Sequence, residues 1–141
     1  MFFVARLLTI GGEYMDLGSE LRNLSSSYNR ENKISEIVHR EFDRIKKMIE
    51  SQAPKMAREG ISAFVLQDSW DSSDACSFIY LGNASRHDIE YAKKLFHQLI
   101  QQYAEINRIS ISYKDGLYKA RYSLLGPPDI SVHISSIRIS W

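Results

Sequence analysis

The clearest hydrophobic pattern in the chain is a helical stripe between residues 29 and 60. Its apolar side chains recur at spacings of three and four, and they are Ile34, Ile37, Val38, Phe42, Ile45, Met48 and Ile49. This period predicts an amphipathic α-helix that buries one face. Pro54 has no backbone donor, so we expect the helix to kink or pause there. Gly60 is the expected C-terminal stop, because glycine tolerates the left-handed conformation that ends many helices.

The N-terminal part of the chain gives two shorter predictions. Leucines at spacings of four and three, from Leu17 to Leu24, predict a separate, shorter helix. The opening stretch MFFVARLLTI is apolar but has no basic region before the apolar run, so we expect a strand rather than a signal peptide, and a protein that is not secreted. Alternatively, the natural start is Met15. Residues 1–14 would then be an upstream extension with no role. In both cases we expect residues 15–141 to form a single α+β domain.

The middle of the chain predicts two strands and a second helix. The apolar segments ISAFVLQD and CSFIYL flank the polar stretch SWDSSDA, which predicts two strands joined as a hairpin. Ser85, with Asp88 three residues later, resembles a capping box and predicts the start of a helix. The apolar stripe that follows is Ile89, Ala92, Leu95, Phe96, Leu99, Ile100, Tyr103 and Ile106. We expect this helix to end near Asn107.

The segment RISISYKDGLYKARYSLL alternates apolar and polar residues on both sides of Asp115-Gly116. This dipeptide is a strong signal for a two-residue type I′ turn, so we expect a β-hairpin here. The expected apolar face of the hairpin consists of Ile109, Ile111 and Tyr113 on the first strand and of Tyr118, Ala120, Tyr122 and Leu124 on the second.

The last residues, DISVHISSIRISW, predict a strand of the core. Two apolar sets alternate with polar residues in opposite phases: Ile130, Val132 and Ile134, then Ile137, Ile139 and Trp141. A β-bulge at Ser135-Ser136 would put both sets on one face, and a tight turn at the serines is the alternative. We expect Trp141 to be buried. The order of elements predicts an α+β domain, with an antiparallel sheet of about four to six strands and two main helices packed on one face.

Composition limits the class of protein. A chain of 141 residues with 44% hydrophobic and 25% charged residues fits one soluble globular domain. The net charge of +1 gives no general attraction to nucleic acid or to acidic membranes, and no apolar run reaches the ~18 residues of a membrane span. The single cysteine, Cys76, excludes an internal disulfide and is expected to be a small buried hydrophobe rather than a reactive thiol. Asn23 and Asn83 begin sequons, which matter only in a secreted chain.

No motif in the sequence predicts catalysis, a metal site or a cofactor. The histidines have no partners at metal-ligand spacing, and they are His39, His87, His97 and His133. We expect His39 and His97 on helix surfaces, whereas a polar pocket around His87 or His133 would point to an enzyme. Three aspartates share one loop without the spacing or glycine of a calcium loop, so a solvated turn is favoured; they are Asp68, Asp71 and Asp74. With no phosphate loop and no nucleophile elbow either, we expect a protein that is not an enzyme.

One face of the terminal strands is expected to be basic and rich in serine. Between Arg108 and Trp141 the chain has five Lys and Arg residues and two Asp residues, a local net charge of +3. The basic residues that would contact nucleic acid or a protein partner are Lys114, Lys119, Arg121 and Arg138. Sheet-based RNA binders also present aromatic side chains on such a face. Here the tyrosines are expected to point inward, which favours a merely solvated face.

Three segments together resemble a known group of viral proteins. A helix ending in Ala57-Arg58-Glu59-Gly60 runs directly into the strand ISAFVL, a second helix leads to ISISY, and the chain closes on IRISW. This layout resembles small uncharacterised α+β proteins of tailed bacteriophages and large DNA viruses, which show a helix ending A-x-x-G and a final I-S-W. The likeness covers residues 34–141 as a layout. The chain departs from the group at YAEINR, where a glycine turn is usual, and in the segment YKDGLYKARYSLLGPPD, which resembles an insertion.

The resemblance implies a virus-encoded accessory protein or a minor, capsid-associated virion component that acts through protein–protein contacts. It implies other viral or host proteins as partners, and a location in the host cell cytoplasm or in the virion. It carries over no catalytic residues. The alternative that the residues themselves suggest is a small nucleic-acid-binding module that uses the basic C-terminal sheet face.

Overall fold

The computed structural model describes residues 8–10, 13–66, 76–120 and 129–141. The chain divides into two compact units, Met1–Lys33 and Ile34–Trp141. The first unit contains two short strands, β1 (Leu8–Ile10) and β2 (Glu13–Met15), which pair antiparallel with each other.

A single long helix, α1 (Leu17–Arg58), runs through the positions where the sequence predicted two helices. The prediction of a separate upstream helix was wrong because the polar residues between Leu24 and Ile34 include no glycine or proline and continue the helix. Pro54 also lies inside α1 and does not end it. Its ring removes one hydrogen bond, and the last turn remains because Met56 packs against the core.

Gly60 ends α1, as the sequence predicted. The residue is left-handed, with φ of 79°. The Ile61 N–H donates to the Met56 carbonyl at 3.0 Å, and the Gly60 N–H donates to the Ala57 carbonyl at 3.0 Å. These two bonds form a Schellman motif, which satisfies helix carbonyls that would otherwise lack donors.

The second helix, α2 (Arg86–Asn107), begins and ends where the sequence predicted. The Ser85 hydroxyl accepts from the Asp88 N–H at 3.2 Å, and the Asp88 carboxylate accepts from the Ser85 N–H at 3.0 Å, so the capping box is confirmed. At the other end Arg108 is left-handed, with φ of 54°. The Ile109 N–H then donates to the Ala104 carbonyl at 3.0 Å.

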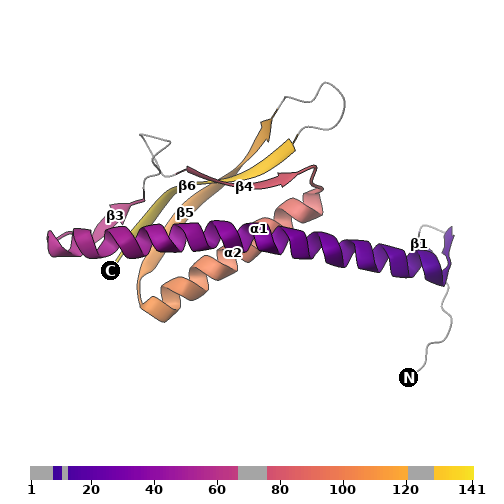
Figure 1. Cartoon of the computed structure of the whole chain (residues 1–141), viewed down its shortest axis with the longest axis horizontal. Coiled ribbons are helices and arrows are strands. Elements are labelled where there is room, and N and C mark those ends of the chain that lie inside the picture. The colour runs from indigo at the N-terminus through magenta and orange to yellow at the C-terminus, as the bar shows by residue number, and fades with distance from the viewer. Residues whose placement is uncertain (1–7, 11–12, 67–75, 121–128) are drawn as a thin grey trace. The chain divides into compact units, whose positions relative to one another are not determined.

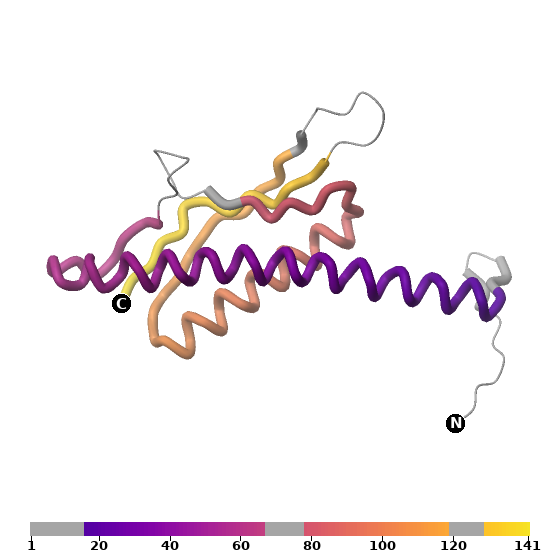
Figure 2. The backbone as a smooth tube through the Cα atoms, viewed as in Figure 1, coloured from indigo at the N-terminus to yellow at the C-terminus, as the bar shows by residue number. Residues whose placement is uncertain are grey.

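The sheet of the second unit is built around β6 (Asp129–Ser140). Strand β5 (Ser110–Ala120) pairs with β6 from end to end and occupies one of its edges, as the orange and yellow segments of Figure 2 show. The other edge is shared by β3 (Ala63–Val65) and β4 (Cys76–Gly82), which pair with successive parts of β6. All pairs are antiparallel. The predicted hairpin of β3 with β4 was therefore wrong, because each strand pairs with β6 instead.

Strand β5 continues without a break through Asp115-Gly116, so the predicted hairpin at this dipeptide was wrong. Gly116 is not among the residues with positive φ, which a type I′ turn would require. Both residues instead pair with β6, Asp115 with Ile134 and Gly116 with His133. Pairing along the whole of β6 replaces the local turn. The predicted strand positions Tyr122 and Leu124 lie outside the described residues.

The bulge predicted at Ser135-Ser136 is confirmed. Ser112 pairs with Arg138 and Lys114 with Ser135, so β6 carries one more residue than β5 over this stretch. Ser136 is left-handed, with φ of 52°. The extra residue puts the two apolar sets of β6 on the same face. On that face Val132, Ile134, Ile137 and Ile139 are at most 1% exposed.

Both helices pack on this face and form one core with the strands (Figure 1). Buried side chains come from every layer, among them Val38 and Ile45 of α1, Phe96 and Ile100 of α2, and Ile79 of β4. The predicted α+β class, with an antiparallel sheet and two helices on one face, is confirmed. The predicted burial of Trp141 was wrong. Its ring contacts Phe64 edge-on at 6.0 Å, but 44% of the residue remains exposed because this contact covers only part of the ring.

Candidate interaction surface

The outer face of the sheet, which points away from the two helices, carries two of the four predicted basic residues. Lys114 on β5 and Arg138 on β6 are both exposed there. Arg138 lies between Ser112 of β5 and Val65 of β3, and Lys114 lies beside Ser135. The backbone of Lys119 pairs with Ile130, while its side chain is not described, and Arg121 lies outside the described residues. The described part of the face is thus only weakly basic.

The same face carries four ring side chains that we call the aromatic patch: Phe78, Tyr80, Tyr118 and His133. Phe78 of β4 and His133 of β6 are cross-strand partners, and their rings are stacked with centroids 4.8 Å apart. Tyr118 of β5 meets Phe78 edge-on at 5.8 Å. The patch therefore spans all three neighbouring strands. Phe78 is 46% exposed, Tyr80 53% and Tyr118 51%, which is a large exposed apolar area for three aromatic residues so close together.

A serine flanked by tyrosines joins the two sides of the patch. Ser131 of β6 pairs with Tyr80 on one side and with Tyr118 on the other, and only 6% of it is exposed. The Tyr80 hydroxyl donates to the carboxylate of Asp129. This hydrogen bond is the main reason why the pKa of Tyr80 is raised above its ordinary value. The bond orients the Tyr80 ring within the patch.

Open space lies over Gly116, within the aromatic patch. Gly116 pairs with His133 on the outer face, and a methyl group on its Cα would meet no heavy atom within 4 Å beyond its chain neighbours. The position is an ordinary strand conformation, so the missing side chain is not required by the backbone. The outer face therefore has room for an added side chain at position 116, opposite His133 on β6.

A groove borders the patch along the edge of the sheet. Ile37, Arg40 and Glu41 of α1 line one side, and Phe78 and Tyr80 of β4 line the other. Glu41 accepts two hydrogen bonds from the Arg44 guanidinium, at 2.7 and 3.1 Å, which hold its carboxylate on the helix. The groove therefore joins the aromatic rings to a helix wall that carries both apolar and charged side chains.

The remaining residues singled out in the sequence do not form a second site in the described part of the chain. His39 and His97 are exposed on their helices, as predicted. Nδ1 of His97 lies 3.2 Å from the Tyr113 hydroxyl. No group of three acidic, histidine or cysteine residues that could hold a metal ion occurs among the described residues. The three aspartates of the predicted solvated turn lie outside those residues, and the side chain of Cys76 is not described.

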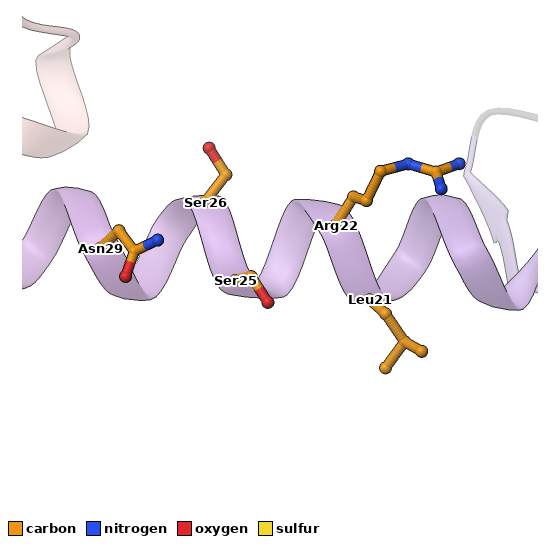
Figure 3. Close-up of a pocket in the computed structure, with 5 residues that line it drawn as sticks. All are labelled: Leu21, Arg22, Ser25, Ser26 and Asn29. Atoms are coloured by element: carbon orange, nitrogen blue, oxygen red, sulfur yellow. The ribbon is translucent and has the colours of Figure 1, made fainter.

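A hollow along α1 in the first unit has no converging side chains. Its lining residues all come from one helix: Leu21, Arg22, Ser25, Ser26 and Asn29. Figure 3 shows that Leu21 points to one side of the helix, whereas Arg22 and Ser26 point to the other. A small molecule would therefore find no enclosed set of polar groups here.

The chain matches no family model, no curated protein and no solved structure. No helix among the described residues has both the length and the apolar character needed to cross a membrane.

The place of Tyr118 in the aromatic patch was missed in the sequence because of the wrong turn at Asp115-Gly116. A two-residue hairpin places Tyr118 on the same face as Tyr113, whereas an unbroken strand places the two on opposite faces. Tyr113 does face the core, and Tyr118 faces outward. The alternation in CSFIYL was the available signal, because burial of Ile79 leaves Phe78 and Tyr80 on the other face.

Proposed function

We propose that this protein is not an enzyme and that it binds a partner protein through the outer face of its sheet, at the aromatic patch. The observation that supports this most is the half-exposed state of Phe78, Tyr80 and Tyr118 on three adjacent strands. Contiguous exposed apolar side chains mark interaction sites, and aromatic residues with arginine are enriched in protein interfaces. Arg138 lies on the same face.

The geometry of the rings favours a protein partner over nucleic acid. Base stacking needs open ring faces, and one face of Phe78 is already covered by His133. The Tyr80 hydroxyl is bound to Asp129, so a negative charge lies beside the patch. Apolar side chains of a protein can instead fill the groove beside Phe78 and the space above Gly116.

The surroundings of the patch specify the chemistry of the partner. Lys114 lies two residues from Gly116 on the same strand and the same face, and it is exposed. Arg138 extends the positive charge along β6. The partner would have a segment in which carboxylates flank an apolar or aromatic side chain. The apolar or aromatic side chain would be buried on the patch, and the carboxylates would pair with Lys114 and Arg138.

The biological setting that we propose follows from the resemblance to phage and large-virus proteins in the helix end Ala57–Gly60 and the terminal I-S-W. In that setting the protein is a virus-encoded accessory protein or a minor virion component. Its partner would be another viral protein or a host protein, met in the host cell cytoplasm or in the particle. The aromatic patch supplies the contact surface that such a role needs.

The test compares two neighbouring residues of β5 that lie on opposite faces. Leu117 and Tyr118 are both 51% exposed, but Leu117 pairs with the buried Val132 on the helix side of the sheet. Full-length protein, Tyr118→Ala and Leu117→Ala are each used as bait in extracts of the cells that produce the protein. We expect a partner that Leu117→Ala retains and Tyr118→Ala loses. Its affinity for the purified proteins is then measured by calorimetry.

Two results would contradict the proposal. One is a partner that binds Tyr118→Ala as tightly as the unchanged protein, when circular dichroism shows both to be folded. The other is recovery of no protein partner by any of the three baits. A Lys114→Glu variant adds a separate readout. If the partner carries carboxylates, this substitution should lower both the association rate and the dependence of that rate on salt concentration.

Single-stranded nucleic acid is the second candidate ligand. The exposure of Tyr118 and Phe78 on the sheet face that also carries Lys114 favours it, since sheet-based RNA binders combine ring stacking with basic side chains. Binding of a labelled oligonucleotide would be followed by fluorescence anisotropy at about 50 and about 200 mM salt, where contacts to phosphate weaken steeply. Absence of binding at the lower salt concentration excludes this candidate, and salt-sensitive binding that Tyr118→Ala removes would replace the protein-partner proposal.

A further inference from the structure

Strand β5 has a free edge within the second unit. One of its edges pairs with β6 from end to end, and no described strand of the second unit pairs with the other. The backbone N–H and C=O groups along such an edge can pair with another strand, and proteins often prevent this with a short edge, a proline or a bulge. β5 is 11 residues long and has no proline, and the extra residue of the bulge lies in β6. The free edge of β5 is thus open to strand pairing.

Leu117 is an exposed apolar residue on this edge strand. It lies on the helix side of the sheet, where its partner Val132 is fully buried, yet 51% of Leu117 is exposed. Tyr113, four residues earlier on the same side of β5, packs edge-on against Phe96 of α2 with ring centroids 5.3 Å apart. Helix α2 therefore covers β5 near Tyr113 and leaves Leu117 half open. A strand added to β5 would bring apolar side chains beside Leu117.

We propose that the protein forms a homodimer in which the free edges of two β5 strands pair antiparallel, about a two-fold axis at Leu117. The two sheets then join into one continuous sheet. In this register Leu117 lies opposite Leu117 of the second copy, and Asp115 lies opposite Lys119. Gly116 lies opposite Tyr118. Residues that lie opposite each other in an antiparallel pair share a face and interact across the strands.

The order of charged and apolar residues along β5 selects this register. Because opposed residues share a face, the second copy can shift only by an even number of residues. A shift of two residues places Leu117 opposite Asp115 in one direction and opposite Lys119 in the other. A shift of four residues pairs Asp115 with itself or Lys119 with itself, and like charges directly opposite each other are unfavourable. The proposed register instead places leucine against leucine, and its two-fold symmetry gives two pairs of opposite charge.

The carboxylate of Asp115 is available to the second copy. Its neighbouring cation in the same chain is Lys93, whose Nζ lies 4.0 Å from Oδ1 of Asp115, too far for a hydrogen bond. The Asp115 side chain remains 39% exposed. It can therefore accept a hydrogen bond from a lysine of the second copy.

The proposed dimer leaves the aromatic patch intact on both copies. Gly116 has no side chain that would displace Tyr118 of the second copy, so the Tyr118 ring can keep its edge-on contact with Phe78 at 5.8 Å. The two patches then lie on the same face of the continuous sheet. Leu117 lies on the other face, so dimerisation and partner binding can be measured independently.

The first experiment reverses one charge at a time and measures the oligomeric state. Asp115→Lys places a lysine opposite Lys119 of the second copy, and Lys119→Asp places an aspartate opposite Asp115. Sedimentation equilibrium of the full chain over a range of concentrations should show a monomer–dimer equilibrium. We expect each variant to raise the dissociation constant by about tenfold or more, because two attractive pairs become repulsive. Lys47→Asp makes the same change of charge at an exposed position of α1, and it should change the dissociation constant less than about twofold.

The second experiment tests the register by mixing the two single variants. In a mixed dimer each lysine of the Asp115→Lys chain lies opposite an aspartate of the Lys119→Asp chain, at both pairs of positions. We expect the mixture to associate about tenfold or more tightly than either variant alone. The double variant Asp115→Lys, Lys119→Asp should also regain the dissociation constant of the unchanged protein to within about threefold.

Three results would overturn the proposal. They are a monomeric unchanged protein at all concentrations, single variants that dimerise as tightly as the unchanged protein, and a mixture that associates no more tightly than its components. Circular dichroism first establishes that each variant is folded. If a charge reversal prevents folding, Leu117→Lys replaces it, because this half-exposed position tolerates a polar side chain and two lysines at the two-fold axis should abolish the dimer. A Leu117→Lys protein that still dimerises would likewise contradict the proposal.

Discussion

The phenyl ring of Phe78 lies face to face with the imidazole of His133, with centroids 4.8 Å apart and planes inclined by 16°. The two residues are direct cross-strand partners on β4 and β6. Cross-strand pairs of this kind stabilise a sheet on the face that they occupy. The same contact covers one side of the Phe78 ring, so a nucleic-acid base could stack only on the other side.

The stack of Phe78 on His133 should be measurable as a coupling energy. In a double-mutant cycle with Phe78→Ala and His133→Ala, we expect a coupling of about 0.5–1.5 kcal/mol in the free energy of unfolding. The control cycle pairs Phe78→Ala with Leu117→Ala, which lies on the other face of the sheet, and should give less than about 0.5 kcal/mol. Chemical denaturation provides both values. Equal couplings in the two cycles would show that the ring contact contributes nothing specific.

Gly116 should accept a branched side chain with a gain in stability. The strand at Gly116 has an ordinary conformation and open space above it, so Gly116→Val removes the entropic cost of glycine in a strand. We expect the free energy of unfolding to rise by about 0.5–1 kcal/mol. Gly82 is the matched control, since it also has open space but a φ of 66°. Gly82→Val should lower the free energy of unfolding by about 1–2 kcal/mol or more.

The same variant also probes the proposed function. Valine at position 116 would fill the space beside His133 and leave Tyr118 in place. If a partner side chain enters that space, Gly116→Val weakens partner binding while it stabilises the fold. If Gly116→Val also unfolded the protein, a loss of binding could not be attributed to the filled space. Partner affinity and the free energy of unfolding are therefore both measured on the same preparation.

The parts of the fold that depend on neighbouring residues could be predicted from the sequence. The capping box at Ser85 and Asp88, the stop at Gly60 and the bulge at Ser135-Ser136 each follow from a few adjacent side chains. The strand pairing could not be predicted in this way. Asp115-Gly116 prefers a turn locally, and the long-range pairing of β5 with β6 overrides this preference.

The place of Tyr118 in the candidate site depended on that one pairing. With the hairpin, Tyr118 faces the core and the outer face is merely basic and solvated; with the unbroken strand, Tyr118 joins Phe78 on the outer face. The positions of the basic residues were predicted correctly in part, because Lys114 and Arg138 lie on this face. The viral resemblance and the absence of catalysis stay predictions.

The C-terminal end of α2 offers a test of backbone strain. Arg108 adopts a left-handed conformation that costs a residue with a side chain about 1–2 kcal/mol. Arg108→Gly should therefore raise the free energy of unfolding by up to about 1 kcal/mol, despite the greater freedom of glycine in the unfolded chain. Ile106→Gly, at an exposed position inside the helix, should lower it by about 0.5–1 kcal/mol. The two glycine substitutions should therefore change the free energy of unfolding in opposite directions. A change in the same direction would argue against backbone strain at Arg108.

Stability at alkaline pH should depend on two tyrosines that connect α2 to its neighbours. Burial raises the pKa of Tyr103 to about 12, and the hydrogen bond from its hydroxyl to Glu50 at 3.1 Å adds to the rise. Burial also raises the pKa of Tyr113 to about 12, with a further contribution from the negative charge of Asp115. Both pKa values lie above the value of about 10 for tyrosine in an unfolded chain.

The sign of the effect follows from proton binding. Between about pH 10 and pH 12 the folded state keeps protons on Tyr103 and Tyr113 that the unfolded state has lost. Their contribution to stability is complete below about pH 10 and is lost as the pH rises toward 12. We expect the free energy of unfolding of the Tyr103→Phe, Tyr113→Phe double variant to fall less steeply over this range than that of the unchanged protein. Urea denaturation at intervals between about pH 8 and pH 11 measures the two slopes. Leu99→Ala, which removes packing without a titrating group, should lower the whole curve and leave its slope unchanged; a double variant with the slope of the unchanged protein would refute the linkage.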